Sequence, residues 1–143
     1  MTHQIDRAFA MAVDAHRGQV DKVGVPYILH VMRVALAGKT EQEQIVGALH
    51  DTVEDTSLTL TAIYDAFGAV VSSAVDALTH REDEEYGLYI ERIARNPLAT
   101  RVKLNDLKDN MDVARMVDPT ERDYKRWYKY GRAYMRLTSV VAG

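Results

Sequence analysis

The chain has 143 residues, of which 47% are hydrophobic and 27% charged, a composition typical of a folded globular domain rather than a disordered segment. It contains no cysteine, so disulfides and thiolate ligands are excluded, and any bound metal ion must be held by histidines and carboxylates. The net charge of −3 gives no basic footprint for nucleic acid, and no apolar run approaches the roughly 18 residues of a membrane span. Because the first residues also lack a signal peptide's apolar region, we expect one cytoplasmic domain over residues 1–143, with neither nucleic acid nor a membrane as partner.

Apolar residues recur at helical spacing along the whole chain. The first stripe covers residues 4–17, a loop follows over residues 18–26, and Pro26 opens the next helix, which ends at Gly38. The next predicted helix begins at the capping-box pair Thr40 and Glu43 and ends in the His-Asp stretch described below. The remaining predicted helices cover residues 59–67, 70–78, 84–95, 98–113 and 119–140. No segment alternates apolar and polar residues for long enough to indicate a strand. The sequence therefore predicts an all-α fold, a single compact bundle of about eight helices.

The most informative segment is residues 50–56, His-Asp-Thr-Val-Glu-Asp-Thr, which follows an apolar run. It places one imidazole and three carboxylates, those of His50, Asp51, Glu54 and Asp55, within six residues. On a continuous helix, residues four apart stack one turn (roughly 5.4 Å) apart, so the two later acids lie one turn beyond the His-Asp pair. That pair can then ligate a metal ion, and the two acids can handle a water molecule or a proton. The alternative is an ordinary helix end with solvated acids.

Further metal ligands must come from other helices. Asp106 lies near the edge of the apolar stripe of its predicted helix, with Asn110 one turn beyond it, although most of that helix is charged and typical of a solvated face. His30 lies inside an apolar segment, where a lone histidine is more often a structural core residue than a ligand. The same ambiguity applies to His16, for which we favour the structural role.

Four segments follow one another in a recognisable order. They are Ala15-His16-Arg17-Gly18-Gln19, Gly24-Val25-Pro26-Tyr27-Ile28-Leu29-His30, residues 50–56, and Val102-Lys103-Leu104-Asn105-Asp106 with Asn110-Met111. Together they resemble the HD-domain hydrolases of the RelA/SpoT group, in the stand-alone form called small alarmone hydrolases. The resemblance covers roughly residues 1–115, and the combination is highly specific although each piece alone is weak. It implies an all-helical HD domain that binds a single Mn²⁺ ion and acts on a guanosine polyphosphate.

Carried over position by position, the resemblance implies four metal ligands: His30, His50, Asp51 and Asp106. Glu54 and Asp55 match the acidic pair that positions and activates the attacking water, and Asn110 matches an asparagine near the sugar and phosphates of the substrate. Two imidazoles and two carboxylates leave coordination positions open, which suits Mn²⁺ or a similar divalent ion better than a closed zinc site. The implied reaction removes the 3′-pyrophosphate from guanosine tetra- or pentaphosphate to give GDP or GTP and pyrophosphate.

The sequence departs from the family pattern in the loop that should choose the base. Many members carry a basic residue two positions after Gln19, where it helps to hold the guanine, but this chain has Asp21 there, followed by Lys22. Either Lys22 takes over the contact or the base preference differs. The other basic residues assigned to substrate binding are Arg33 and Lys103, for each of which a solvated or salt-bridged role is the alternative.

Three functions are open at this point. The first is that of an Mn²⁺-dependent guanosine-3′,5′-bis(diphosphate) 3′-pyrophosphohydrolase, whose partner is its small-molecule substrate. The second keeps the site but changes the nucleotide, as in an NADPH 2′-phosphatase or a nucleotidase, and Asp21 is the feature that favours it. The third is a non-catalytic nucleotide-binding module, against which the intact acidic pair argues.

Five aromatic residues gather on the last predicted helix: Tyr124, Trp127, Tyr128, Tyr130 and Tyr134. We interpret them as core and packing residues rather than as a platform on which a base stacks. Some of them can instead form a contact between subunits, so an oligomer stays open.

Overall fold

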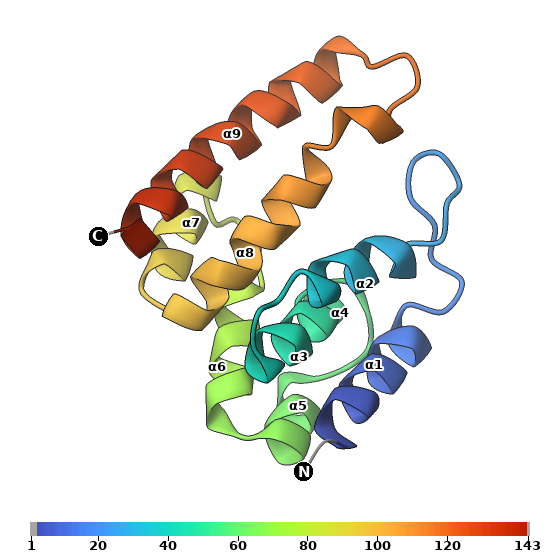
Figure 1. Ribbon diagram of the computed structural model, residues 1–143, viewed down its shortest axis with the longest axis vertical. Coiled ribbons are helices and arrows are strands. Elements are labelled where there is room, and N and C mark those ends of the chain that lie inside the picture. Colours follow the sequence, from blue (N-terminus) through green and yellow to red (C-terminus); the bar gives the residue numbers. More distant parts are fainter. Residues whose placement is uncertain (1–2, 143) are drawn as a thin grey trace.

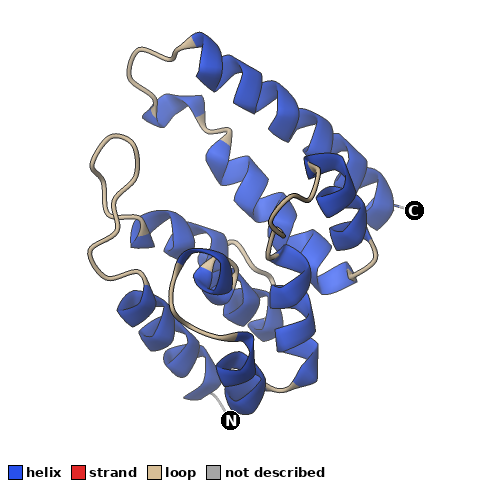
Figure 2. Cartoon of the chain, turned by 180° about the vertical axis from the view of Figure 1, so that it is seen from behind, coloured by secondary structure: helices blue, strands red, loops and turns tan. Residues whose placement is uncertain are grey.

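Every regular element of the computed structural model, which describes residues 3–142, is a helix (Figures 1 and 2). The elements are α1 (His3–Ala15), α2 (Ile28–Leu36), α3 (Glu41–Leu49), α4 (Thr52–Asp55), α5 (Leu60–Phe67), α6 (Ala69–Leu78), α7 (Tyr86–Ala94), α8 (Pro97–Asn110), the 3₁₀ turn η1 (Val113–Arg115) and α9 (Glu121–Ala142). Within residues 3–142 no strand is present, and the β pairing is a single antiparallel bridge between Val20 and Pro26. The predicted all-α bundle is confirmed.

α3 lies at the centre of the bundle, where it packs against α1, α2, α6 and α8. Its second half, residues 45–49, is apolar on all sides, as a helix surrounded by others must be, and Val46 and Leu49 are fully buried. Gly47 allows a close contact between α2 and α3, because a Cβ atom at this position would lie 2.8 Å from the Cα atom of Ala35 in α2. This contact brings the carboxyl end of α3 beside α2.

Side-chain caps fix the starts of the two helices on which the site depends. The hydroxyl of Thr40 accepts from the backbone N–H of Glu43 at 3.1 Å, so Thr40 caps the start of α3 as predicted, while the Glu43 carboxylate accepts from the N–H of Lys39 at 3.3 Å and not from that of Thr40. Asn96 accepts from the N–H of Ala99 at 3.0 Å, and Pro97 occupies the first turn of α8.

A turn at His50 and Asp51 separates α3 from α4, whereas we expected one helix to continue through this stretch. Two side chains explain the difference, because they donate to carbonyls of the last turn of α3 that a continuing helix would use. His50 Nδ1 donates to the carbonyl of Gly47 at 2.6 Å, and the hydroxyl of Thr52 donates to the carbonyl of Leu49 at 2.8 Å. The acidic pair therefore lies on its own one-turn helix.

α9 packs along α8 and α7 at one side of the molecule (Figure 1). Ala133 and Leu137 are its buried apolar positions. The prediction that its aromatic residues form core is wrong for Tyr124 and Tyr128, which are exposed because they lie on the side of the helix away from α7 and α8. Among residues 3–142, no helix combines the length and the apolar character needed to cross a membrane.

Candidate metal centre

Three buried side chains from three elements converge at one point: His30 of α2, His50 at the end of α3, and Asp106 of α8. One potential ligand atom from each residue lies within 4.8 Å of the others. A cluster of two imidazoles and a carboxylate at this separation could hold a divalent metal ion.

A hydrogen bond fixes the orientation of His50. A carbonyl oxygen can only accept, so the 2.6 Å contact with the carbonyl of Gly47 places the proton on Nδ1 and leaves Nε2 as the acceptor atom. That buried Nε2 makes no hydrogen bond in the structure, and it lies 3.0 Å from Asp51 Oδ2 and 3.4 Å from Asp106 Oδ1. A nitrogen lone pair next to two carboxylates is unfavourable unless a proton or a metal cation lies between them. The donor set therefore fits a cation.

The pKa values in the cluster also indicate that the site favours positive charge. Burial alone would lower the pKa of His50, but the carboxylates of Asp51 and Asp106 outweigh it and raise that pKa well above its usual value. Burial would raise the pKa of Asp106, but Lys103 and the two histidines hold it well below the ordinary value for an aspartate. The raised pKa values of both imidazoles have the same cause, the negative charge of the surrounding carboxylates, which a metal ion would also offset.

Asp109 orients the second histidine and was not singled out by the sequence. Its Oδ2 lies 2.6 Å from His30 Nδ1, while His30 Nε2 lies 2.9 Å from Asp106 Oδ1. A carboxylate on the outer nitrogen is the usual device that directs the other nitrogen of a histidine toward a metal. Burial would raise the pKa of Asp109, but its bonds with His30 and Arg33 lower that pKa to about 2. The available signal was its spacing, three residues after Asp106 on the same helix.

Asp51 and Lys103 each contact one member of the cluster, His50 and Asp106 respectively. The hydroxyl of Tyr27 donates to Asp51 Oδ2, the same oxygen that approaches His50. Lys103 Nζ donates to Asp106 Oδ2 at 2.8 Å, and its side chain is largely buried over the ring of Tyr89. The structure thus places Lys103 on a predicted metal ligand and not among the residues that line the cleft described below.

Both members of the predicted acidic pair are exposed on α4 and are held by other segments. Glu54 Oε1 accepts from the backbone N–H of His80 at 2.7 Å, and the main-chain carbonyl of Asp55 accepts from the side chain of Gln19 at 3.0 Å. Partial burial and the nearby charges of Asp51 and Glu54 raise the pKa of Asp55 to about 6. A carboxylate with a pKa near neutrality suits an acceptor of protons.

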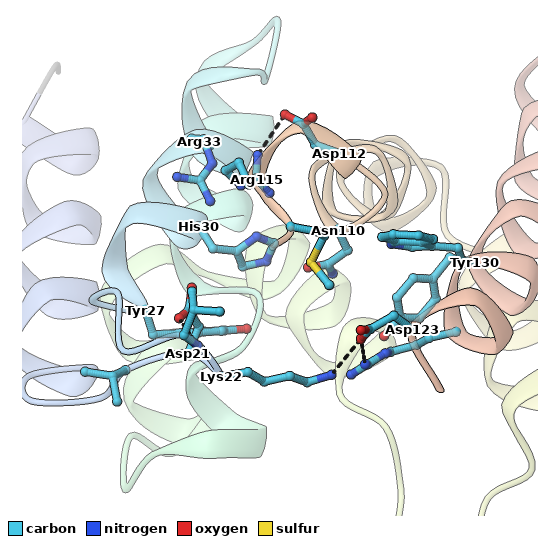
Figure 3. A pocket seen from close by; sticks show the side chains of 15 residues that line it. Asp21, Lys22, Tyr27, His30, Arg33, Asn110, Asp112, Arg115, Asp123 and Tyr130 are labelled. Atoms are coloured by element: carbon cyan, nitrogen blue, oxygen red, sulfur yellow. Dashed lines mark hydrogen bonds and ion pairs between the residues drawn. The ribbon is translucent and has the colours of Figure 1, made fainter. Parts of the chain in front are cut away.

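A cleft of about 380 Å³ opens next to His30, between the loop after α1 and α9 (Figure 3). The predicted substrate residues Lys22, Arg33 and Asn110 line it. Other lining residues were not assigned to the site from the sequence: Arg115, Met116, Arg126, Trp127 and Tyr130. Two of the aromatic residues that we interpreted as packing groups therefore border the cleft.

In the loop after α1, Asp21 and Lys22 make different contacts. Asp21 Oδ1 accepts from the backbone N–H groups of Val23 and Val25 at 2.9 and 3.0 Å, so its carboxylate closes the loop on itself. Lys22 extends into the cleft, where its Nζ lies 3.7 Å from Asp123 Oδ1 (Figure 3). Both residues line the cleft, and Asp21 in addition shapes the loop.

Comparison with known proteins shows which families and structures this chain resembles. The family described as "HD domain" matches residues 8–96. The chain is 33% identical over 135 residues to a GTP pyrophosphokinase of Streptomyces coelicolor and 34% identical over 120 residues to a guanosine-3′,5′-bis(diphosphate) 3′-pyrophosphohydrolase of Aquifex aeolicus. These alignments cover 85% and 76% of this chain but only 16% and 17% of the relatives, so the chain spans about a sixth of their length. A solved structure of a metazoan ortholog of SpoT, described as hydrolysing ppGpp, has a similar fold, with a TM-score of 0.79 and 23% identity over 96% of this chain and 86% of that one.

Proposed function

This chain belongs to the HD-domain family, and from that premise we propose that it is an Mn²⁺-dependent hydrolase that removes the 3′-pyrophosphate of guanosine tetra- or pentaphosphate. The observation that carries the proposal is the convergence of His30, His50 and Asp106 next to a cleft that His30 lines together with four basic side chains, Lys22, Arg33, Arg115 and Arg126. The similarity to the Aquifex pyrophosphohydrolase supports the choice of substrate.

His30, His50, Asp51 and Asp106 would hold one divalent ion. The absence of sulfur from the ligand set favours Mn²⁺ or a similar hard ion. When bound, such an ion supplies a Lewis acid that lowers the pKa of water and offsets phosphate charge. The two histidines present Nε2 toward it because Asp109 and the carbonyl of Gly47 occupy Nδ1.

The remaining steps belong to residues of the chain. Asp55, whose pKa is about 6, accepts the proton of the attacking water, and Glu54 orients that water. The bond between the first phosphorus of the 3′-pyrophosphate and the ribose 3′ oxygen breaks, the water oxygen stays on the pyrophosphate, and a proton returns to the 3′ oxygen. Lys22, Arg126 and Asn110 line the cleft where the phosphates and sugar would bind.

Asp21, the residue that favoured a different nucleotide substrate, has a structural role in its loop. Asp21 argued against guanine when its carboxylate was expected to face the base. Because one oxygen of that carboxylate accepts from the amides of its own loop, the basic contact falls to Lys22, whose Nζ also lies 3.7 Å from Asp123 Oδ1. Guanosine polyphosphate is therefore the substrate that we propose.

The test is incubation of Mn²⁺-loaded protein with ppGpp, NADPH and nucleoside monophosphates, followed by identification of the phosphate released. We expect pyrophosphate from ppGpp and none after chelation of the metal. Release of orthophosphate from NADPH or a monophosphate would instead indicate a phosphatase, and binding without turnover would indicate a binding module.

A Glu54→Gln, Asp55→Asn double variant should bind the metal and lose activity, and full activity would refute the roles of these two acids.

A further inference from the structure

Glu54 is held by a segment distant from it in the sequence. The backbone N–H of His80 donates to its Oε1 at 2.7 Å, from the connection between α6 and α7. Glu54 itself is exposed on a helix of only four residues, so its own element restricts its side chain little. Whatever fixes the amide of His80 therefore also fixes the direction of this carboxylate.

Arg92 of α7 organises that connection. Its guanidinium binds the carboxylate of Glu84 with two parallel hydrogen bonds of 2.9 and 2.8 Å. The same group donates to the main-chain carbonyl of Thr79 at 2.9 Å and to that of Ala77 at 3.2 Å. The side chain is only 25% exposed, and it thus connects the end of α6 to the residues that precede α7. Lysine cannot make this set of contacts, because they need the planar fork of an arginine.

The ring of His80 is fixed by the same connection. Its Nε2 donates to the carbonyl of Glu84 at 2.7 Å, and the ring stacks on Tyr89 with centroids 4.5 Å apart. The hydroxyl of Tyr89 donates to the carbonyl of Leu78 at 2.7 Å. Glu84 is therefore bound on one side by Arg92 and on the other, through its backbone, by His80.

We propose that Arg92 is a positioning residue: by holding the connection between Thr79 and Glu84, it aims the N–H of His80 at Glu54 and so sets the orientation of that carboxylate. The inference rests on the proposed function, in which Glu54 orients the attacking water. Arg92 is not among the residues that line the cleft, and it contacts none of the predicted metal ligands. Its effect passes through the backbone of residues 79–84. Because catalysis depends steeply on alignment, a small rotation of Glu54 is enough to slow the reaction.

The test compares Arg92→Lys with Arg136→Lys. Arg136 makes an equivalent two-bond contact with Glu91, at 2.6 and 2.8 Å, on a part of α7 and α9 that does not reach Glu54, so it is a matched control. For Arg92→Lys we expect kcat to fall by about 10- to 100-fold, with KM and the affinity for Mn²⁺ changed by less than about threefold. Arg136→Lys should keep the wild-type kcat. Guanidinium ion at millimolar concentration should restore part of the lost kcat in Arg92→Ala.

Hydrogen exchange at the His80 amide gives a readout that needs neither metal nor turnover. We expect the amide to be protected in the wild type and in Arg136→Lys, and to exchange faster in Arg92→Lys. Wild-type kcat in Arg92→Lys, an equal loss in Arg136→Lys, or unchanged exchange at His80 would each overturn the inference. If the wild-type protein does not hydrolyse ppGpp, the proposed function fails instead. The exchange experiment then decides alone whether Arg92 sets the orientation of the Glu54 carboxylate.

Discussion

Single hydrogen bonds decide which nitrogen each buried histidine presents to the cluster. The tautomer of His50 is fixed by its hydrogen bond to the carbonyl of Gly47, which is part of the backbone and cannot be changed by a substitution. His30 is committed by the carboxylate of Asp109, which also accepts from Arg33 Nε at 2.8 Å. Asp109 is therefore the point at which the geometry of the ligand set can be altered without removal of a ligand.

We predict that Asp109→Asn weakens the binding of divalent metal by about 10- to 100-fold, the usual cost of a lost partner behind a ligating histidine. The neutral amide gives His30 a weaker acceptor and leaves Arg33 without its counter-charge. Calorimetric titration with Mn²⁺ measures the effect. Asp112→Asn is the control, because Asp112 binds Arg115 at 3.0 Å but does not contact His30. Equal losses in both variants would assign the effect to Arg115 and the surrounding charge.

The raised pKa of Asp55 predicts a pH-dependent cost to the metal-free protein. Its folded-state pKa of about 6 exceeds the ordinary 3.8, so the folded state gains stability from this group below about pH 4 and loses it as the pH rises through 6. In metal-free protein, Asp55→Asn should therefore raise the free energy of unfolding at pH 7.5 by roughly 1 kcal/mol, allowing for solvent screening of this exposed group, and change it little at pH 4. Urea denaturation at the two pH values measures it. A gain of the same size at both would mean that charge is not the cause.

At the scale of helices, the contact between α2 and α3 brings the two histidines together. We predict that Gly47→Ala destabilises the protein by about 1–3 kcal/mol, because the added methyl group would meet backbone atoms of Ala35 that cannot move alone. It should also weaken metal binding, since His30 and His50 lie on the helices that are forced apart. Gly131→Ala in α9 is the control, because a Cβ atom there meets nothing within 4 Å and should stabilise the helix by about 0.5–1 kcal/mol. Thermal unfolding measures the stability of both variants. A Gly47→Ala variant as stable as the wild type would contradict the close approach of α2 and α3.

The helices themselves could be predicted because their signals are local. Thr40 and Asn96 cap helices where the sequence indicates starts, and the period of apolar residues gives the inner faces. The break after α3 could not be predicted, because it depends on side-chain donors of His50 and Thr52 that bind carbonyls of the preceding turn. Trp127 shows the other limit: helical spacing places it on an inner face, but only the positions of separate loops make that face part of a cleft.

The candidate site was predictable in part for the same reason. His30, His50 and Asp106 could be assembled from motif order, and the structure brings them together. Asp109 and the amide of His80 have no motif of their own, since their contacts depend on the packing of elements far apart in the chain. Lys103 shows that a basic residue at helical spacing from a proposed ligand can bind that ligand.

Over the whole molecule, the site joins two parts of the chain. His30 and His50 come from the first fifty residues, whereas Asp106 belongs to α8, which packs with α7 and α9 (Figure 1). Acidic groups gather around the proposed ligands, while the adjacent cleft is bordered both by Lys22, Arg115 and Arg126 and by the carboxylates of Asp112 and Asp123. A bound cation would therefore connect the two parts and lower the repulsion among the acids at the same time.

This arrangement predicts that Mn²⁺ stabilises the fold as a whole and not only the cluster. An ion that binds the folded state alone at a hundredfold excess over its Kd adds about 2.7 kcal/mol to the free energy of unfolding, which for a chain of this size raises Tm by roughly 8 °C. Asp106→Asn should abolish the shift, since it removes the ligand contributed by α8, whereas Asp14→Asn, which alters a surface pair with Arg17, should retain it. Calorimetric melting with and without Mn²⁺ measures both. A shift that survives in Asp106→Asn would place the ion elsewhere, because the remaining proposed ligands, His30, His50 and Asp51, do not connect α8 to the first half of the chain.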